Sequence, residues 1–587
     1  MMSQKTILIT GATDGIGLAL AQYYAQRAAF QPTRLVLVGR RSLEELYAAG
    51  LPPQLFTPIT YLQTDLAQDD GVQKIRNWLQ YFNINQIDLL INNAAMGYIG
   101  PAEVQTPEHI EQLVNVNLHT PIALTHALMP FVEQVQGKIV YISSVASIYP
   151  APDYATYVAT KAALEGFVRN LRIELKAAKR KVSVQLIRPG ATRTGIHSKS
   201  GATPAHISQK QWENFDSAVN VATDIAKAIP KRQTFVTIGA KNQWSYRVAQ
   251  LFEGFLAWGM TRMRKFRKSR EPLPLSLPEK STQTVPAQVA PAEPHPAQMI
   301  PGQQPAKPTQ AKSTQAKTFH CLITGAANGI GKSLAAVYGT NGYLITGVDS
   351  DRTNAMYTQS ELHQADVRIR FALIDLGKTS EMDRLVEMLS DRPPIDVLIH
   401  NAGISSLGHF ADSNLQRQQA VLNVNFRAPM QLTAKLLQTQ NLAYGAQIVC
   451  ISSLSHFVGY PGAAVYAASK DGLHTYAKNL SLALTDYNIG VTTVYPGPTN
   501  TDHARKYSPD NRNEEKRMIP GVLARQILLA ANRRQRVLIP GTNNKVYAAA
   551  GKYFPGITEF TMKRAILDKL DKPAPTSEQP LLNAPQQ

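Results

Sequence analysis

The sequence contains Tyr157-Val-Ala-Thr-Lys161 and, 309 residues later, Tyr466-Ala-Ala-Ser-Lys470. Residues four apart lie on one face of a helix, so in each stretch the tyrosine hydroxyl and the lysine ammonium can be neighbours. A phenol has an ordinary pKa of about 10, and a cation beside it favours the phenolate and lowers that pKa. Each stretch therefore predicts a tyrosine that can give and take protons near neutral pH.

A serine lies at the same distance before each tyrosine. Ser144 and Ser453 both precede their tyrosine by 13 residues, and each ends an apolar run of strand character, 138–144 and 447–453. The carboxyl ends of parallel strands are the places where open α/β sheets bind their ligands. The repetition of the whole pattern indicates two copies of one catalytic domain.

Length and composition limit the number of domains and the kinds of partner that the chain can have. A chain of 587 residues exceeds one ordinary core, and a formal net charge of +19 suggests anionic ligands, nucleic acid or an anionic membrane surface as partners. The basic residues are spread through tails and linkers without a known nucleic-acid motif, so we expect no nucleic-acid partner. Cys321 and Cys450 lie in apolar runs and are expected to be buried thiols, with no metal site. No apolar run approaches the roughly 18 residues that span a bilayer, which favours a cytoplasmic protein.

Each copy begins with a strand, a glycine-rich turn and a helix. The first turn carries Gly11, Gly15 and Gly17, and the second restarts the pattern from 319 onward. Glycines allow the backbone to approach a phosphate closely, and the helix N-terminus favours an anion. Strand and helix signals then alternate through both halves, which predicts a parallel, doubly wound sheet in each.

These motifs together resemble the short-chain dehydrogenase/reductase family of the classical type, in two tandem copies that span nearly everything except the linker and termini. The resemblance implies an α/β chain of two doubly wound, parallel-sheet Rossmann-fold domains joined by a disordered linker. It also implies that tyrosine is the acid–base group, serine polarises the substrate carbonyl, lysine holds the nicotinamide ribose and asparagine supports a proton relay. The catalytic residues so implied are Asn117, Ser144, Tyr157 and Lys161 in the first copy and Asn425, Ser453, Tyr466 and Lys470 in the second.

The resemblance further implies a cofactor-binding set in each copy. In the first copy this set is Gly11, Gly15, Ile16, Gly17, Arg40, Asp65, Leu66, Asn93, Ala94, Pro189, Gly190 and Thr192. In the second it is Gly325, Gly329, Ile330, Gly331, Asp349, Asp375, Leu376, Asn401, Ala402, Pro496, Gly497 and Thr499. Two positions depart from the family pattern: Ala95 replaces a glycine and His400 replaces an asparagine.

The two copies differ where the second strand ends. The first has Gly39 and Arg40 there, which offer room and positive charge for the 2′-phosphate of NADP. The second has Asp349, which would bind both hydroxyls of the NAD ribose and repel a phosphate. We therefore expect NADP in the first domain and NAD in the second, although Arg40 and its neighbour Arg41 could also be ordinary surface arginines.

The domain division follows the composition. We expect a first domain at 1–243, an amphipathic basic helix at 244–270, a linker rich in proline, alanine and glutamine at 271–317, a second domain at 318–545, a C-terminal helix at 546–571 and a disordered tail at 572–587. The 244–270 helix could lie on an anionic membrane or pack on its own domain, so peripheral membrane contact stays open. The domains could pair within the chain or as a homo-oligomer.

The predicted function is a bifunctional oxidoreductase that interconverts small-molecule alcohols with ketones or aldehydes. The main alternative is one catalytic domain joined to a nucleotide-sensing or dimerising module, and a membrane-associated scaffold is a second. Because each copy has its own serine, tyrosine, lysine and asparagine, we expect the two sites to work independently.

Overall fold

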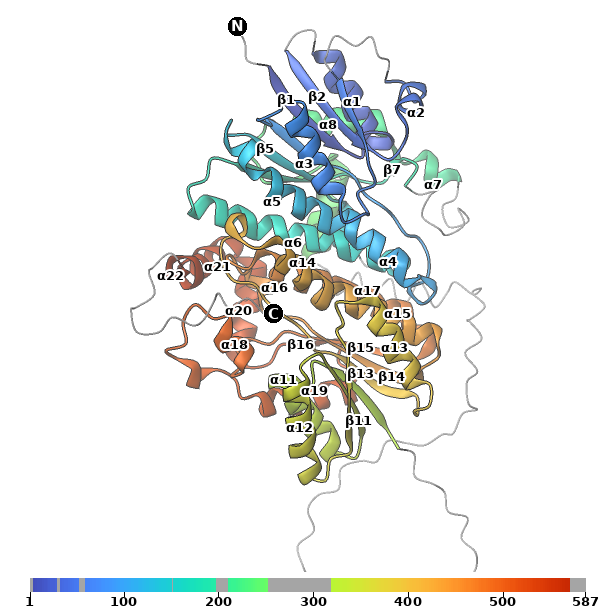
Figure 1. Ribbon diagram of the computed structural model, residues 1–587, viewed down its shortest axis with the longest axis vertical. Helices are drawn as coiled ribbons and strands as arrows, with labels where there is room; N and C mark the ends of the chain where they lie inside the picture. Colours follow the sequence, from blue (N-terminus) through green and yellow to red (C-terminus); the bar gives the residue numbers. More distant parts are fainter. Residues whose placement is uncertain are drawn as a thin grey trace, which may run out of the picture.

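The computed structural model describes residues 4–28, 32–51, 59–149, 151–196, 209–251 and 318–570. The linker at 271–317, most of the expected basic helix at 244–270 and the tail at 572–587 lie outside this part of the chain. Two domains lie one above the other, with the helices α6 and α17 between them (Figure 1).

Each domain is built on a seven-stranded sheet whose paired strands all run parallel. The first sheet, in spatial order, consists of β3 (Ile59–Gln63), β2 (Thr33–Gly39), β1 (Lys5–Thr10), β4 (Leu89–Asn92), β5 (Lys138–Ile142), β6 (Ser183–Arg188) and β9 (Phe235–Thr237). The second consists of β12 (Ile369–Leu373), β11 (Leu344–Asp349), β10 (His320–Thr324), β13 (Ile395–His400), β14 (Leu442–Ile451), β15 (Gly490–Val494) and β16 (Val537–Leu538). A small ribbon of β7 (Thr192–Arg193) and β8 (Asp216–Ser217) is added to the first domain. The doubly wound parallel sheets expected from the alternating pattern are confirmed.

Helices cover both faces of each sheet. In the first domain they are α1 (Gly15–Arg27), α2 (Leu43–Ala48), α3 (Gly71–Tyr81), α4 (Pro107–Val114), α5 (Thr120–Glu133), α6 (Ala155–Ala177), α7 (Gln209–Glu213), α8 (Ala218–Ala228) and α9 (Ala240–Leu251). In the second they are α11 (Gly329–Thr340), α12 (Arg352–Gln364), α13 (Thr379–Leu389), α14 (Leu415–Leu422), α15 (Ala428–Gln438), α16 (Ser455–Val458), α17 (Ala464–Ala483), α18 (Asp502–Lys506), α19 (Pro520–Asn532), α20 (Thr542–Tyr553), α21 (Pro555–Met562) and α22 (Asp568–Leu570). Helix α20 runs through the domain boundary expected at 545/546. None of the described helices is both long enough and apolar enough to cross a membrane.

The hydrophobic core explains why the strands are apolar on both faces. In β1, Leu8 points to the face covered by α3, α5 and α6, whereas Ile7 and Ile9 point to the face covered by α1 and α8. The second domain repeats this arrangement, and Cys321 and Cys450 are buried free thiols in its strands. Burial on both faces is what a parallel sheet requires, and it produces the continuous apolar runs seen in the sequence.

The inner core is continuous across the two domains. Phe167 of α6 and Phe410 of the second domain are both buried, with their ring centroids 5.0 Å apart. Helices α6 and α17 can approach closely because a glycine faces the partner helix on each side: a Cβ on Gly166 would overlap the Asp471 carboxylate of α17, and a Cβ on Gly472 would lie 3.0 Å from the Ala163 side chain of α6. The domains are therefore paired within one chain through helices that carry the tyrosine–lysine stretches.

Ion pairs join the two domains at the edges of this contact. Arg427 of the second domain lies 2.5 Å from Glu111 of the first, and the arginine side chain is largely buried. At another edge Arg180 binds Asp412 at 2.9 Å. Both pairs join the two domains, and the pair with the more exposed carboxylate, Arg180 with Asp412, contributes little free energy.

We predict that Gly472→Ala destabilises the full chain. The new methyl would lie 2.6 Å from the buried Phe426 ring and 3.0 Å from the Ala163 side chain, so neither neighbour can move aside cheaply. Overpacking of this kind costs about 1–3 kcal/mol in the free energy of unfolding. Urea unfolding followed by circular dichroism measures the effect.

The control is Gly521→Ala in α19, where a Cβ would have no other atom within 4 Å. Alanine is the better helix former by about 1 kcal/mol, so this variant should be as stable as the parent chain or more stable. A Gly472→Ala protein that unfolds at the parent's urea concentration would contradict the close packing of α6 and α17.

Candidate active sites

A glycine turn links β1 to α1 in the first domain and β10 to α11 in the second. Gly11 and Gly15 have φ of +65° and +52°, and Gly325 and Gly329 have +64° and +55°. A Cβ on the third glycine of either turn would overlap the carbonyl oxygen of the first. Only glycines fit, and the resulting shallow cradle at a helix N-terminus suits the pyrophosphate of a dinucleotide.

The expected cofactor residue Asn93 supports this turn from the end of β4. Its side-chain amide donates to the carbonyls of Thr10 and Gly11 at 3.0 and 3.3 Å, and its backbone N–H donates to the Thr10 hydroxyl. Ala94 donates its N–H to the same hydroxyl at 3.1 Å. Asn401 and Ala402 make the matching bonds to Thr324 and Gly325. Both asparagines therefore hold the glycine turn in shape.

The two departures from the family pattern are accommodated. A Cβ at Gly403, the position of Ala95 in the first copy, would lie at an ordinary 3.4 Å from Asn425 Oδ1 and Lys470 Nζ, so an alanine fits there. His400 is buried, and its Nε2 lies 2.8 Å from the Thr433 hydroxyl. Burial lowers the pKa of His400 to about 3, so the imidazole is neutral and acts as a hydrogen-bonding core residue.

The predicted catalytic asparagines lie in matching π-helical turns, Asn115–His119 and Asn423–Arg427. Asn117 is fully buried and binds both the N–H and the carbonyl of Met96, at 2.8 and 2.9 Å. Asn425 binds Ile404 with the same two distances. Each asparagine thereby fixes the loop that follows the central strand, next to the helix of its own tyrosine.

The two lysines are buried below their tyrosines. Lys161 Nζ donates to the Ile142 carbonyl at 3.0 Å and lies 5.8 Å from the centroid of the Tyr157 ring. Lys470 does the same with Ile451, at 3.0 Å, and lies 5.7 Å from the Tyr466 ring. Burial lowers the pKa of each lysine to about 8, and Glu165 partly opposes this effect at Lys161.

Burial also has the largest effect on the pKa of the two tyrosines. It raises the pKa of Tyr157 to about 12, against a hydrogen bond with Ser144 that lowers it, and Tyr466 is raised in the same way against a bond with Ser453. The sequence-based expectation that lysine brings the tyrosine pKa toward neutrality is therefore not met in this structure. Each lysine ammonium donates to a strand carbonyl, and desolvation of the phenol outweighs the influence of that cation.

The remaining cofactor residues end the strands or begin the helices. Asp65 Oδ1 and Asp375 Oδ1 accept the N–H two residues further on, at 3.0 and 2.9 Å, next to the buried Leu66 and Leu376. Ile16 and Ile330 are half-buried at the second position of α1 and α11. After the last Pro-Gly, Thr192 and Thr499 each donate their hydroxyl to the glycine carbonyl of Gly190 and Gly497, with Pro189 and Pro496 just before. All predicted residues of a set thus line the carboxyl end of one sheet.

Two contacts were not predicted from the sequence: an asparagine that packs against a glycine in both domains, and a hydrogen bond that is made in the second domain. Asn242 and Asn544 pack against Gly190 and Gly497, where a Cβ would overlap their side-chain amides. They follow the last core strand at equivalent places, and their repetition at a spacing of 302 was the available signal. In the second domain Asn328 donates to Asp502 at 2.9 Å, which ties α18 to the glycine turn. Among the described residues there is no group of three or more histidines, cysteines or acids that could hold a metal.

The ends of β2 and β11 differ as the sequence suggested. Arg40 is exposed, whereas Arg41 turns back to the glycine turn, donates to the Thr13 carbonyl at 3.1 Å and lies 3.4 Å from Asp14. In the second domain the Asp349 carboxylate accepts the N–H of Ala327 in the turn at 2.9 Å. A Cβ on Gly39, the counterpart of Asp349, would overlap the Thr13 side chain. The first domain therefore has no room for an acid at this position.

Comparison with known proteins agrees with this architecture. The family model for short chain dehydrogenase matches residues 5–205 and 320–512, together more than half of the chain. The mouse (Mus musculus) Dehydrogenase/reductase SDR family member 7B is 32% identical over 252 residues, which cover 40% of this chain and 74% of the relative. The 11-beta-hydroxysteroid dehydrogenase-like 4A of Arabidopsis thaliana is 30% identical over 244 residues, which cover 40% of this chain and 75% of the relative.

Two solved structures are similar to part of the chain. The short-chain dehydrogenase from Sphingobium yanoikuyae in complex with NADPH is 26% identical, with a TM-score of 0.36, and covers 46% of this chain and 98% of that one. The short chain dehydrogenase/reductase from Burkholderia phymatum in complex with NAD is 22% identical, with a TM-score of 0.37 and the same coverage.

The family match falls on both domains and covers every strand of each seven-stranded sheet except the last, β9 in the first domain and β16 in the second. The chain therefore belongs to the short-chain dehydrogenase/reductase family, as two tandem copies in one polypeptide, and is an NAD(P)-dependent oxidoreductase that acts on CH–OH groups.

Proposed function

We propose that the chain is a bifunctional oxidoreductase with one complete hydride-transfer site in each domain, acting on alcohols and on ketones or aldehydes. The observation that supports this proposal is the repetition of one hydrogen-bond pattern. In both copies the asparagine binds the loop after the central strand, and the lysine donates to the last carbonyl of the strand that leads to the serine. The alternative, a second domain that only binds a nucleotide or pairs the domains, gives no reason for a second intact set.

A nicotinamide cofactor bound at the glycine turn supplies the hydride donor or acceptor. In each site the serine and tyrosine hydroxyls would hold the substrate oxygen by hydrogen bonds. The tyrosine hydroxyl then gives its proton to that oxygen in the reduction and takes it back in the oxidation. The lysine ammonium below the ring favours the phenolate left by the first step, and the buried asparagine keeps the adjoining loop in place.

We predict that Tyr157→Phe abolishes only the activity of the first domain and Tyr466→Phe only that of the second. Loss of the proton-transferring group lowers kcat at the altered site by about 10²–10⁴-fold. A panel of alcohols and ketones, assayed in the full chain with both NADP(H) and NAD(H), measures the two activities.

The controls are Tyr141→Phe and Tyr338→Phe, which remove hydroxyls of buried core tyrosines, one in each domain. Both should retain the two activities. If either catalytic substitution silences both activities, the sites are shared or one copy is structural.

The finer proposal concerns the cofactors: NADP(H) in the first domain and NAD(H) in the second. Arg40 and Arg41 give the first domain two cations at the end of β2, and Asp349 gives the second domain an acid at the end of β11. A guanidinium can bind a 2′-phosphate with charge-assisted hydrogen bonds, and a carboxylate repels it.

We predict that Arg40→Ala and Arg41→Ala each weaken NADPH binding by about 10–100-fold, the effect of losing one hydrogen bond to a charged group. Asp349→Asn should let the second domain accept NADPH. Fluorescence titration of the full chain with NADPH and NADH measures both changes. Arg34→Ala, at the opposite end of β2, is the matched control and should bind NADPH as the parent does. Equal affinity of the first site for both cofactors, unchanged by Arg40→Ala, would contradict the proposal.

A second proposal is peripheral contact with an anionic membrane. The segment 244–270 that suggested it is described only to Leu251, but its Trp244 is 70% exposed. A further surface lies on α20 and α21, and we call it the C-terminal apolar surface. It consists of Val546, Tyr547, Tyr553, Phe554, Ile557 and Phe560, each more than half exposed, among the cations Lys545, Lys552, Lys563 and Arg564.

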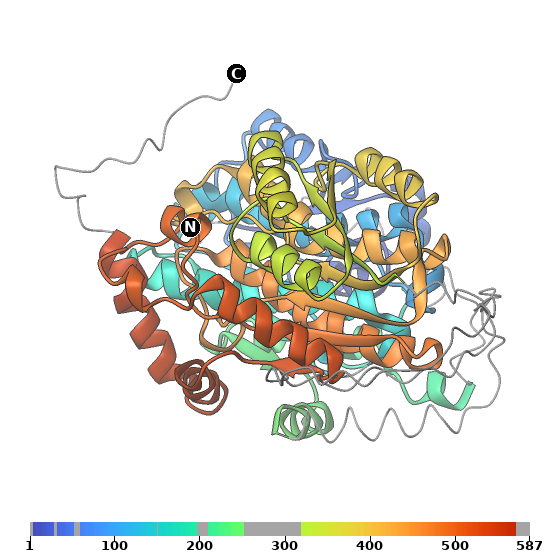
Figure 2. The ribbon, with the colours of Figure 1, turned by 90° about the horizontal axis from the view of Figure 1, so that it is seen from below.

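These helices lie along one edge of the molecule (Figure 2). Residues of α9 and α20 line the same cavity. Exposed aromatic and aliphatic side chains surrounded by cations suit the headgroup region of an anionic bilayer. The charge of the chain, +19, has the sign that this contact requires.

We predict that the full chain sediments with phosphatidylserine-containing vesicles at low salt and less so at high salt. Each basic residue near such a surface contributes about 1 kcal/mol, which salt screens. The double variant Phe554→Ser/Ile557→Ser should bind these vesicles more weakly. Met356→Ser/Tyr357→Ser, which changes two exposed apolar residues on α12, should bind as the parent does. Failure of the parent chain to sediment, or equal binding by both double variants, would rule this surface out.

A further inference from the structure

In each domain one loop joins the catalytic serine to the catalytic tyrosine helix. We call the described residues 145–149 and 151–154 the first catalytic loop and 454–463 the second catalytic loop. Both contain short helical turns and irregular backbone, so their N–H and carbonyl groups need partners outside regular secondary structure. Several of these partners come from the opposite domain.

The most direct contact is made twice, in opposite directions. Asn479 of the second domain accepts the N–H of Ala151 in the first catalytic loop at 2.5 Å. Asn170 of the first domain accepts the N–H of Tyr460 in the second catalytic loop at 2.7 Å. Both donors and both acceptors are related by the same spacing of 309 residues. The bond thus follows the approximate twofold relation of the two domains.

The orientation of both asparagine amides is fixed by their own helices. Asn479 Nδ2 donates to the Thr475 carbonyl at 2.8 Å, and Asn170 Nδ2 donates to the Gly166 carbonyl at the same distance. Both side chains are fully buried. With its donor engaged inside the helix, each amide has its oxygen directed at the loop of the other domain.

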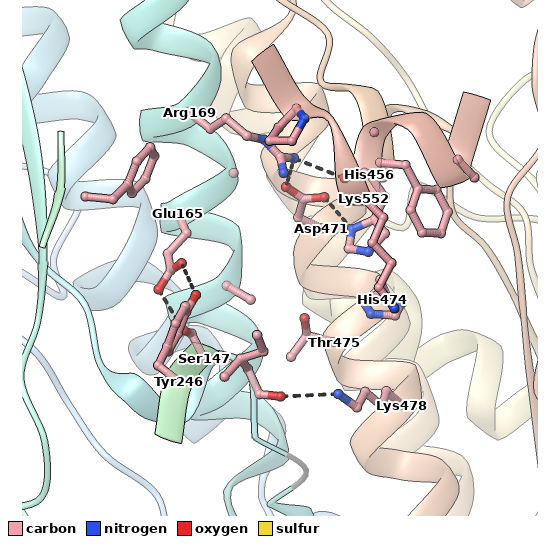
Figure 3. A pocket seen from close by; sticks show the side chains of 18 of the residues that line it. Ser147, Glu165, Arg169, Tyr246, His456, Asp471, His474, Thr475, Lys478 and Lys552 are labelled. Carbon is pink, nitrogen blue, oxygen red and sulfur yellow. Dashed lines mark hydrogen bonds and ion pairs between the residues drawn. The ribbon is translucent and has the colours of Figure 1, made fainter. Parts of the chain in front are cut away.

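A second pair of residues, at the same spacing, binds a carbonyl of the opposite loop. Lys478 donates to the Ile148 carbonyl and Arg169 to the His456 carbonyl, both at 3.2 Å (Figure 3). Arg169 also lies 2.7 Å from the Asp471 carboxylate, whose other oxygen is 2.7 Å from His456 Nδ1. Arg169 therefore binds the backbone of the second catalytic loop directly, and through Asp471 it also holds the His456 side chain of that loop.

The second catalytic loop receives one more support from the first domain. Buried Glu174 accepts the N–H of Gly462 at 2.7 Å and the N–H of Phe410 at 2.9 Å. Its counterpart 309 residues later is Ala483, which has no side-chain acceptor. The dependence of the two loops on the opposite domain is therefore mutual but unequal.

From these contacts we propose that each domain completes the active site of the other. Asn479 and Lys478 are positioning residues for the first site, and Asn170 and Arg169 are positioning residues for the second. The bonds act on the stretch between serine and tyrosine of one site, so a loosened loop displaces the groups that hold the substrate oxygen. The inference rests on the proposed function for its effect on catalysis, but its effect on the loops stands on the contacts alone. The chemical step of each site stays separate under this proposal, but the catalytic loop of each domain depends on contacts from the opposite domain.

The test is Asn479→Ala and Asn170→Ala in the full chain, followed by hydrogen–deuterium exchange with mass spectrometry. Loss of the acceptor leaves the N–H of a partly buried loop residue without its partner, which should speed exchange about 5–100-fold in the loop concerned. Asn479→Ala should affect the first catalytic loop and Asn170→Ala the second. Ser481→Ala is the matched control on α17, because its hydroxyl binds only the Lys478 carbonyl of its own helix among the described residues.

Lys478→Met provides a second route, since this side chain is only half-buried and its loss leaves α17 folded. It should also speed exchange in the first catalytic loop alone. Unchanged exchange in that loop for both Asn479→Ala and Lys478→Met, or equal acceleration in both loops, would overturn the proposal.

Kinetics test the catalytic part with substrates taken from the alcohol and ketone panel. Asn479→Ala should lower kcat at the first site by about tenfold or more, leave KM for the cofactor unchanged and leave the second site active. A loosened first loop with an unchanged kcat would overturn the positioning role. If neither site turns over any substrate, the proposed function has failed, and the exchange data still decide whether the loops depend on the opposite domain.

Discussion

The close packing of α6 on α17 is the constraint on which the rest of the structure depends. One face of α6 presents Tyr157 and Lys161 to the first site, and another face presents Gly166 and Asn170 to the opposite domain. A helix is stiff over a few turns, so a change of the contact with α17 moves the catalytic face as well. Domain pairing and catalytic geometry are therefore properties of the same helix in each copy.

Much of the fold and of both sites could be predicted because their signals are local. The glycine turns, the apolar runs before Ser144 and Ser453, and the tyrosine–lysine spacing each belong to a few consecutive residues. Asn170 and Asn479 were not found, because their role depends on a contact between domains. Their common identity at a spacing of 309 was visible, but only the packing of α6 on α17 gives it meaning.

The pKa values of the acid–base groups could not be predicted from the sequence spacing alone. The four-residue spacing correctly predicted that the lysine lies near the tyrosine. The pKa values of both side chains, however, are set by how deeply the two groups are buried. Burial favours the neutral form of each, so the pKa of Tyr157 rises to about 12 while that of Lys161 falls to about 8. At neutral pH the tyrosine is therefore protonated and ready to donate, and the lysine remains largely charged below it.

The two copies share the support of their catalytic loops but differ at the positions proposed to select the cofactor. The selecting positions, Gly39 with its arginines and Asp349, end β2 and β11, which lie in the outer parts of the two domains (Figure 1). The positioning residues Asn170 and Asn479 lie on the helices between the domains. A substitution at β2 or β11 can therefore change the cofactor of one site without loosening the loop of the other. Mutual support of the two catalytic loops and the proposed difference in cofactor preference are compatible because different elements carry them.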